Sequence, residues 1–191
     1  MISRGDTKLK VWDISNGAIQ STPIAEHVIE RGRETDCCWS PDGEWIAFGE
    51  THATDPSKPG NPPKVDSSIH VWNAHTMIEH RVFSQEAQSS YPTYTLIGFS
   101  ADSRQLAWSV QCPDDFHYCI WDVGADKNKP PRRVPATAKP NSALEEFRSL
   151  SFDPQGKRAV TTHWRSPKET NPCVQVWDND TGELLLVVSG H

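Results

Sequence analysis

The chain has 191 residues, and its 36% hydrophobic and 23% charged residues are typical of a globular protein with a buried core. Its formal net charge of −6 argues against a broad basic surface, which disfavours nucleic acid as a partner. No segment has the character of a signal peptide or the roughly 20 apolar residues of a membrane helix, so we expect no membrane partner and a cytoplasmic or nuclear location. The five cysteines, an odd number without a C-x-x-C pair, favour reduced thiols.

The first predicted strands lie in residues 8–24. In "LKVWD", the apolar residues Leu9 and Val11 stand three and one positions before Trp12, which is the alternation of a half-buried strand. A short turn follows, and a second strand is predicted in "AIQSTPI" at 18–24.

Residues 35–83 are predicted to form four antiparallel strands. "DCCWSPDGEWIAFGE" indicates a β-hairpin, because the turn at 41–43 consists of the proline, aspartate and glycine that tight turns prefer. "IHVWN" repeats the apolar alternation before Trp72 and forms the third strand, and "IEHRVF" forms the fourth. Cys37 and Cys38 fall in the first strand, where packing is favoured over a reactive or metal-binding role.

The same order of strands is predicted twice more, over 94–136 and 147–189. The hairpins are "LIGFSADSRQLAWSV" and "SLSFDPQGKRAVTTHW", with turn residues in the same place as in the first hairpin. The third strands, "YCIWD" and "VQVWD", contain Trp121 and Trp177, and the fourth strands are "RRVPA" and "LLLVVSG". No useful length of sequence has helical periodicity, so the predicted fold class is all-β.

A repeat of four short strands over about 40 to 50 residues is the pattern of a β-propeller blade. The segments resemble WD40 repeats, whose Trp-Asp pair stands here at 12–13, 121–122 and 177–178 and is Trp-Asn at 72–73. The resemblance includes an Asp, or once an Asn, six positions before each tryptophan, which the family places in the turn between the second and third strands. The structural markers of the repeat are Asp6, Trp12, Asp66, Trp72, Asp115, Trp121, Asn171 and Trp177.

The chain departs from WD40 repeats in the hydrogen-bond network that often joins the tryptophan, this Asp, a Ser or Thr and a His. Phe48, Trp108 and Thr161 stand at the Ser/Thr position, where only Thr161 fits. His27 lies too far ahead of Trp39 for the usual spacing of the histidine. We therefore expect the blades to be held mainly by apolar stacking, with contributions from Trp45, Phe48, Trp108 and Phe152.

The resemblance implies a partial β-propeller, one WD40-like domain over 1–191. Residues 8–24 would form the outer strands of one blade, and 35–83, 94–136 and 147–189 would form complete blades, about three and a half in all. Because blades bury their faces against one another, this count indicates a fragment of a longer protein, or else a natural short form that takes blades from a partner. A third interpretation is that the chain is the product of a decayed gene and has no function.

Binding residues are expected in loops, because a rigid scaffold positions them there. The long second-to-third-strand and fourth-to-first-strand connections share the top face of a WD40-type propeller. We predict a protein-binding surface on that face; its candidate residues are Arg33, Glu34, Tyr91, Tyr94, Glu146 and Arg148. Ordinary solvated loops are the competing interpretation. The basic run at 127–133 would lie on the opposite face, as a nuclear-import or acidic-partner patch or as a solvated turn.

No catalytic residue, cofactor or metal site is predicted. The sequence lacks a G-x-S-x-G elbow and a G-K-S/T phosphate loop, and the spacing of His75 and His80 fits no metal template. The leading hypothesis is a non-catalytic scaffold or sensor that binds other proteins. Further blades of its own full-length chain are a second kind of expected partner. The alternative is a TolB-like or peptidase-type propeller that accompanies an enzyme domain outside this chain, since "SPDGEWIAF" is also similar to those repeats.

Overall fold

The computed structural model describes residues 2–5, 8–13, 17, 21–28, 32–53, 65–85, 93–112, 115–126, 128–135, 146–164 and 173–189. All regular structure in these residues is β-strand, and fifteen strands form four antiparallel sheets. The all-β fold class is therefore confirmed. In this part of the chain no helix is long and apolar enough to span a bilayer.

Each sheet consists of strands that follow one another along the chain and pair with their neighbours. The first sheet has three strands: β1 (Ile2–Gly5), β2 (Lys8–Val11) and β3 (Ala25–Val28). The second has β4 (Gly32–Trp39), β5 (Trp45–Ala53), β6 (Val65–Asn73) and β7 (Ile78–Gln85). The third has β8 (Thr93–Phe99), β9 (Gln105–Cys112), β10 (Asp115–Asp122) and β11 (Arg132–Pro135). The fourth has β12 (Glu146–Phe152), β13 (Arg158–Trp164), β14 (Cys173–Asp178) and β15 (Leu184–Ser189).

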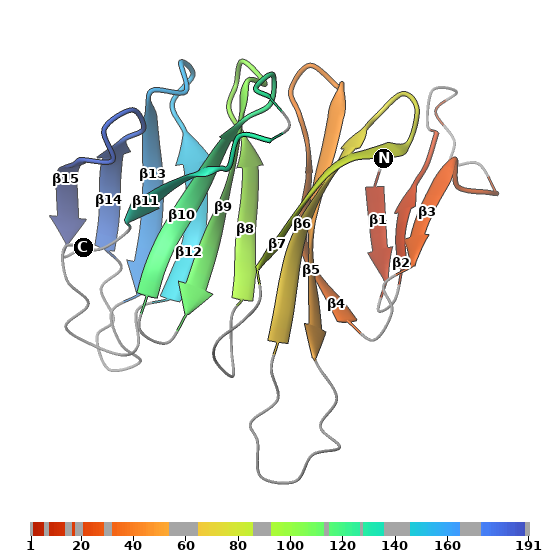
Figure 1. Ribbon diagram of the computed structural model, residues 1–191, viewed down its shortest axis with the longest axis horizontal. Helices are drawn as coiled ribbons and strands as arrows, with labels where there is room; N and C mark the ends of the chain where they lie inside the picture. Colours follow the sequence, from red (N-terminus) through yellow and green to blue (C-terminus); the bar gives the residue numbers. More distant parts are fainter. Residues whose placement is uncertain are drawn as a thin grey trace, which may run out of the picture.

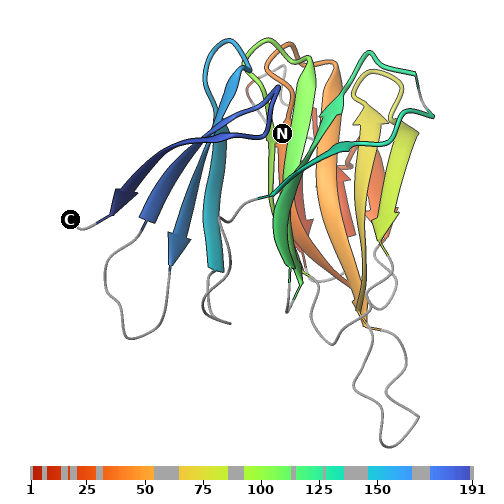
Figure 2. The ribbon, with the colours of Figure 1, turned by 60° about the vertical axis from the view of Figure 1, so that its left-hand side comes forward.

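The sheets stand side by side in chain order, from the first at the right of Figure 1 to the fourth at the left. In Figure 2, after rotation, the fourth sheet is splayed outward at the left. The first strands of the last three sheets are neighbours, because β8 packs beside both β4 and β12. This is the arrangement of propeller blades, whose sheets are placed radially with their first strands innermost.

The first sheet differs from the strands predicted in 8–24. β1 is an additional strand that the sequence did not indicate. The predicted strand at 18–24 is wrong: residues 21–24 lie outside any strand, 18–20 lie outside the described residues, and β3 pairs with β2 instead. Pro23 explains the shift, because it has no N–H to donate to a β-ladder. The next residue, Ile24, donates its N–H to Val11 O at 2.8 Å.

One apolar cluster occupies each interface between sheets. Between the first and second sheets, Leu9 and Val11 meet buried residues of β5 and β6. Between the second and third sheets, the cluster includes Phe83 and Trp108, and between the third and fourth it includes Tyr118 and Ala159. Alternate residues of a middle strand therefore serve opposite interfaces, and the core is a series of layers between neighbouring blades.

The tryptophans of the last three sheets, Trp72, Trp121 and Trp177, are buried, and each belongs to the apolar cluster shared with the preceding sheet. Trp177 donates its Nε1–H to Thr161 Oγ1 at 3.0 Å, as expected for the position where a threonine fits. The equivalent nitrogens of Trp72 and Trp121 are buried and make no hydrogen bond to any described atom. Aromatic contacts occupy that space instead, since Trp72 meets Phe48 edge-on at 5.3 Å. The expectation that apolar stacking replaces the polar network is confirmed for these two sheets.

The remaining two residues named for stacking also contribute to the core. Trp45 is partly buried against the cluster between the second and third sheets, and Phe152 against the cluster between the third and fourth. Both lie beside the turn that joins the first and second strands of their sheet. They therefore close the interface at that end.

A repeated side-chain acceptor holds the turn between the first and second strands. Ser40 Oγ donates to Asp42 and accepts a hydrogen bond from the N–H of Trp45. Ser100 Oγ likewise donates to Asp102 and accepts one from the N–H of Gln105. In the fourth sheet, Asp153 accepts the equivalent N–H groups directly. The third residue of each turn has a positive φ, which Gly43 and Gly156 adopt freely and Ser103 adopts at 62°. The predicted turns at 41–43, 101–103 and 154–156 are therefore confirmed.

Candidate functional site

Five of the six predicted binding residues lie near the starts of the inner strands. Their positions are Arg33 and Glu34 on β4, Tyr94 on β8, and Glu146 and Arg148 on β12. Tyr91 lies outside the described residues. These strand starts share one edge of the molecule, the lower edge in Figure 1. The fold thus gathers the backbone positions of the five residues at one end of three adjacent strands.

A β-bulge interrupts each inner strand beside these positions. The register shifts just after Glu34 on β4, just after Tyr94 on β8 and just after Phe147 on β12. A bulge bends its strand and redirects side chains, and bulges are frequent next to functional sites. Asp36, inside the first bulge, accepts the N–H of Ile97 on β8 at 3.2 Å. Neighbouring inner strands are therefore linked at the level of the bulges.

The repeat markers before the tryptophans lie differently from the expectation. Asp66 is the second residue of β6 and Asp115 is the first residue of β10, so both belong to strands and not to the turns that precede them. They are paired there with His52 and Cys112 of the preceding strands, which extends the ladder to these residues. The other two markers, Asp6 and Asn171, lie outside the described residues.

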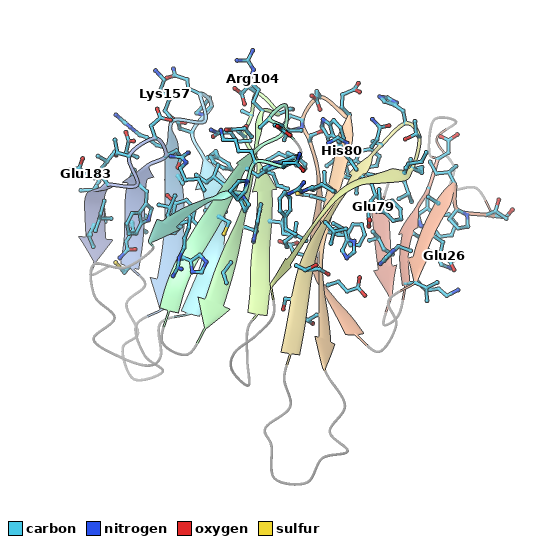
Figure 3. All side chains as sticks on the ribbon, viewed as in Figure 1. Glu26, Glu79, His80, Arg104, Lys157 and Glu183 are labelled. Carbon is cyan, nitrogen blue, oxygen red and sulfur yellow. The ribbon has the colours of Figure 1, made fainter. Side chains whose placement is uncertain are left out.

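The opposite edge of the molecule carries short turns with charged side chains. Arg104, Lys157 and Glu183 are labelled along this edge in Figure 3. Part of the basic run at 127–133 lies in one of these turns, where the ammonium group of Lys129 stands 3.3 Å from an Asp122 oxygen. Both side chains are exposed, so this ion pair contributes little to stability.

A polar cluster that the sequence did not indicate lies between the first and second sheets. It consists of His27 on β3, Glu50 on β5 and His70 on β6, with nitrogen and oxygen atoms all within 4.8 Å of one another. Glu50 Oε2 is 3.0 Å from His27 Nε2 and 3.3 Å from His70 Nε2. We call these three residues the His–Glu–His cluster. Their positions in the sequence are too far apart for a local motif, and the pairing of β5 with β6 and the packing of β3 bring them together.

Aromatic rings position the two imidazoles of the cluster. His70 stacks on Phe48 with ring centroids 4.9 Å apart and an interplanar angle of 6°. His27 contacts the same phenyl ring at 5.0 Å and meets Trp72 edge-on at 5.5 Å. The stacking on Phe48 uses the face of the His70 ring and leaves both of its ring nitrogens available for polar contacts.

The carboxylates around His70 determine its charge. Its Nδ1 lies 2.8 Å from Glu79 on β7, a residue labelled in Figure 3. Burial disfavours the imidazolium, but hydrogen bonds with Glu50 and Glu79 outweigh burial and raise the pKa of His70 above its ordinary value. Glu50 is only 4% exposed, so its charge also needs a cation close by. The cluster therefore concentrates negative charge in a nearly closed space.

The order Ser68, His70 and Glu79 is similar to the hydrogen-bond order of a catalytic triad. Ser68 Oγ lies 3.0 Å from His70 Nε2, and Glu79 lies at Nδ1. Glu50, however, lies 3.3 Å from the same Nε2 and competes with Ser68 for it. Ser68 also lies within a paired strand and not on a sharp turn. The geometry thus favours a cation-binding cluster over a nucleophile.

The radial sheets and their inner strands define the chain as a β-propeller, and its four-stranded antiparallel sheets fit a partial, WD40-like one. Solved structures with this fold are similar over nearly the whole chain. A chain of the mitotic checkpoint complex matches with a TM-score of 0.64 and 13% identity, covering 98% of this chain and 45% of that chain.

Propellers of other classes match as well. The β-propeller domain of the trilobed protease from Pyrococcus furiosus gives a TM-score of 0.58 and 12% identity over 85% of this chain and 44% of its own. TolB from Acinetobacter baumannii gives a TM-score of 0.50 and 18% identity, covering 96% of this chain and 38% of the TolB chain. The chain thus spans less than half of the length of each of these three structures. No family model and no curated protein matches the sequence.

Proposed function

We propose that the chain is a non-catalytic module of the WD40-repeat type that binds another protein through the starts of its inner strands. The observation that carries this proposal is the alignment of Arg33, Glu34, Tyr94, Glu146 and Arg148 beside three bulges at one end of adjacent strands. Arginine and tyrosine are the residues most often found at the energetic centre of protein interfaces. A rigid sheet core behind them would limit the entropy lost on binding.

A second candidate function is a propeller that accompanies an enzyme domain. The similarity to the trilobed protease propeller and to TolB favours this alternative. In that case the same edge would contact the enzyme domain and not a separate partner.

Charge reversal at the two edges tests the proposal. The protein is isolated from cells with its cross-linked partner, and the affinity for that partner is then measured with purified components. We expect Arg33→Glu and Arg148→Glu to weaken binding about tenfold or more each, which corresponds to about 1.4 kcal/mol. Arg104→Glu and Lys157→Glu are matched controls on the opposite edge and should leave the affinity within about twofold.

Two results would contradict the proposal. The first is a loss of binding in the opposite-edge controls with no loss in Arg33→Glu and Arg148→Glu. The second is labelling of the protein, as isolated from cells, by a serine-hydrolase probe, together with loss of hydrolase activity when the charges of the inner-strand residues are reversed. That second result would establish the enzyme-associated alternative.

A further inference from the structure

The His–Glu–His cluster has the donor atoms of a transition-metal site. Two imidazole nitrogens and one carboxylate oxygen are ligands that zinc accepts, with bonds of about 2.0 to 2.2 Å. In a tetrahedral arrangement such bonds place neighbouring donor atoms about 3.3 Å apart. The Glu50 oxygen lies 3.0 Å from His27 Nε2 and 3.3 Å from His70 Nε2, so a small shift of side chains would admit the ion.

Glu79 supplies the outer partner that ligating histidines usually have. Its carboxylate lies 2.8 Å from His70 Nδ1, the nitrogen on the far side of the ring from Glu50. An N–H donated from Nδ1 to a carboxylate fixes the tautomer whose Nε2 lone pair is free for a metal, and it increases the basicity of that lone pair. Phe48, stacked on the ring at 4.9 Å, holds the imidazole in this orientation.

The charges of the cluster are also balanced by a divalent cation. Glu50 and Glu79 bring two negative charges to His70, and Glu50 is almost entirely buried. One divalent ion with two neutral imidazoles neutralises both carboxylates, and so do two imidazolium groups without a metal. The metal and the protons are therefore alternative occupants, and metal binding releases protons.

We propose that His27, Glu50 and His70 bind a divalent transition-metal ion, with zinc as the preferred ion, and that this ion joins the first sheet to the second. His27 belongs to β3 and the other two ligands belong to β5 and β6, so the ion bridges two blades. The His27 side chain is 22% exposed, which gives the ion a route from solvent. Water would complete the four-coordinate shell of a zinc ion with three protein ligands. His70 Nδ1–H and Glu79 orient the site from behind.

Zinc chloride added to the metal-free chain provides the direct test. Competition with a chromophoric chelator should show one zinc ion bound per chain, and cobalt(II) in its place should give the intense visible bands of four-coordinate cobalt. His27→Gln and Glu50→Gln should each weaken zinc binding at least about tenfold, and Glu79→Gln about tenfold through the orientation of His70. Affinity should also fall as the pH decreases, because protons compete for both imidazoles.

His75→Gln is the matched control. His75 Nε2 also lies 3.0 Å from a glutamate oxygen, on Glu44, but its side chain is 65% exposed and no third ligand is near it among the described residues. This variant should keep the zinc affinity, the cobalt spectrum and the increase in melting temperature that zinc causes. His27→Gln should abolish that increase; because His27 lies at the rim, the metal-free variant should still fold, as circular dichroism can verify.

The proposal is overturned if the wild-type chain binds zinc no more tightly than His27→Gln does. It is also overturned if His75→Gln loses the ion to the same extent, because zinc would then occupy surface histidines only. A six-coordinate cobalt spectrum that is unchanged in the Glu50→Gln variant would lead to the same conclusion.

Discussion

Replacing Thr161 by valine tests whether the hydrogen bond to Trp177 stabilises the fourth sheet. Valine has nearly the shape of threonine, so the change exchanges a hydroxyl for a methyl group without opening a cavity. Thr161 Oγ1 accepts the indole N–H at 3.0 Å, and the exposed fractions of the two residues are 0% and 2%. The variant loses one net hydrogen bond, about 1 kcal/mol, and leaves a buried N–H without a partner, which adds about 1 kcal/mol. We therefore expect a loss of about 2 kcal/mol in the free energy of unfolding.

Urea unfolding followed by tryptophan fluorescence and circular dichroism measures this loss as a lower midpoint with an unchanged slope. Thr162→Val is the matched control, because it makes the same chemical change one residue later. Thr162 Oγ1 bonds Ser149 at 2.7 Å on the solvent-facing side of the sheet, where water can replace the partner. The control should cost less than about 0.5 kcal/mol. Equal losses in the two variants would refute the role assigned to the buried indole N–H.

Two further predictions concern the turns between first and second strands. Ser103 has a φ of 62° and accepts the Asp42 N–H from the neighbouring sheet at 3.0 Å. Both Ser103→Ala and Ser103→Gly lose this bond, but only glycine relieves the backbone strain. The glycine variant should therefore be more stable than the alanine variant by about 1 kcal/mol in the free energy of unfolding, measured by urea unfolding. Equal urea midpoints for the two variants would contradict the strain. Hydrogen bonds from Ser40 and Ser100 lower the pKa of Asp42 and Asp102 below the ordinary 3.8. Their stabilisation is therefore present above pH 3.8 and lost as the pH falls through the lowered values, and an Asp42→Asn, Asp102→Asn double variant should lose less stability than wild type on acidification.

The sheets could be predicted from the sequence because their signals are local. Alternating apolar residues before Trp72, Trp121 and Trp177 mark the third strands, and turn residues at fixed places mark the hairpins. The prediction was wrong at 18–24, where apolar residues suggested a strand and Pro23 delayed the pairing until Ile24. The strand at 2–5 has no comparable pattern, and its pairing with β2 defines it.

The His–Glu–His cluster could not be predicted because its members share no local pattern. His27 precedes Glu50 by a complete strand and a hairpin, and His70 follows on another strand. The register of β5 against β6 and the packing of β3 on Phe48 decide that the three side chains meet. The binding residues predicted at the inner strands stay a prediction, because the fold determines their common edge but not their role.

The Trp-Asp pair acts in this chain as two separate structural devices. Trp72, Trp121 and Trp177 are 7%, 1% and 2% exposed. Of these three, only Trp177 donates its indole N–H to a described side chain, that of Thr161, which lies on the paired strand two residues beyond its ladder partner Ala159. Burial of the large ring against the preceding sheet is therefore sufficient to account for the tryptophan. The residue after it acts in the following turn: Asn73 and Asp178 each accept two backbone N–H groups and a threonine hydroxyl. An amide oxygen serves this purpose as well as a carboxylate, which explains why Asn73 can replace the aspartate without loss of the turn.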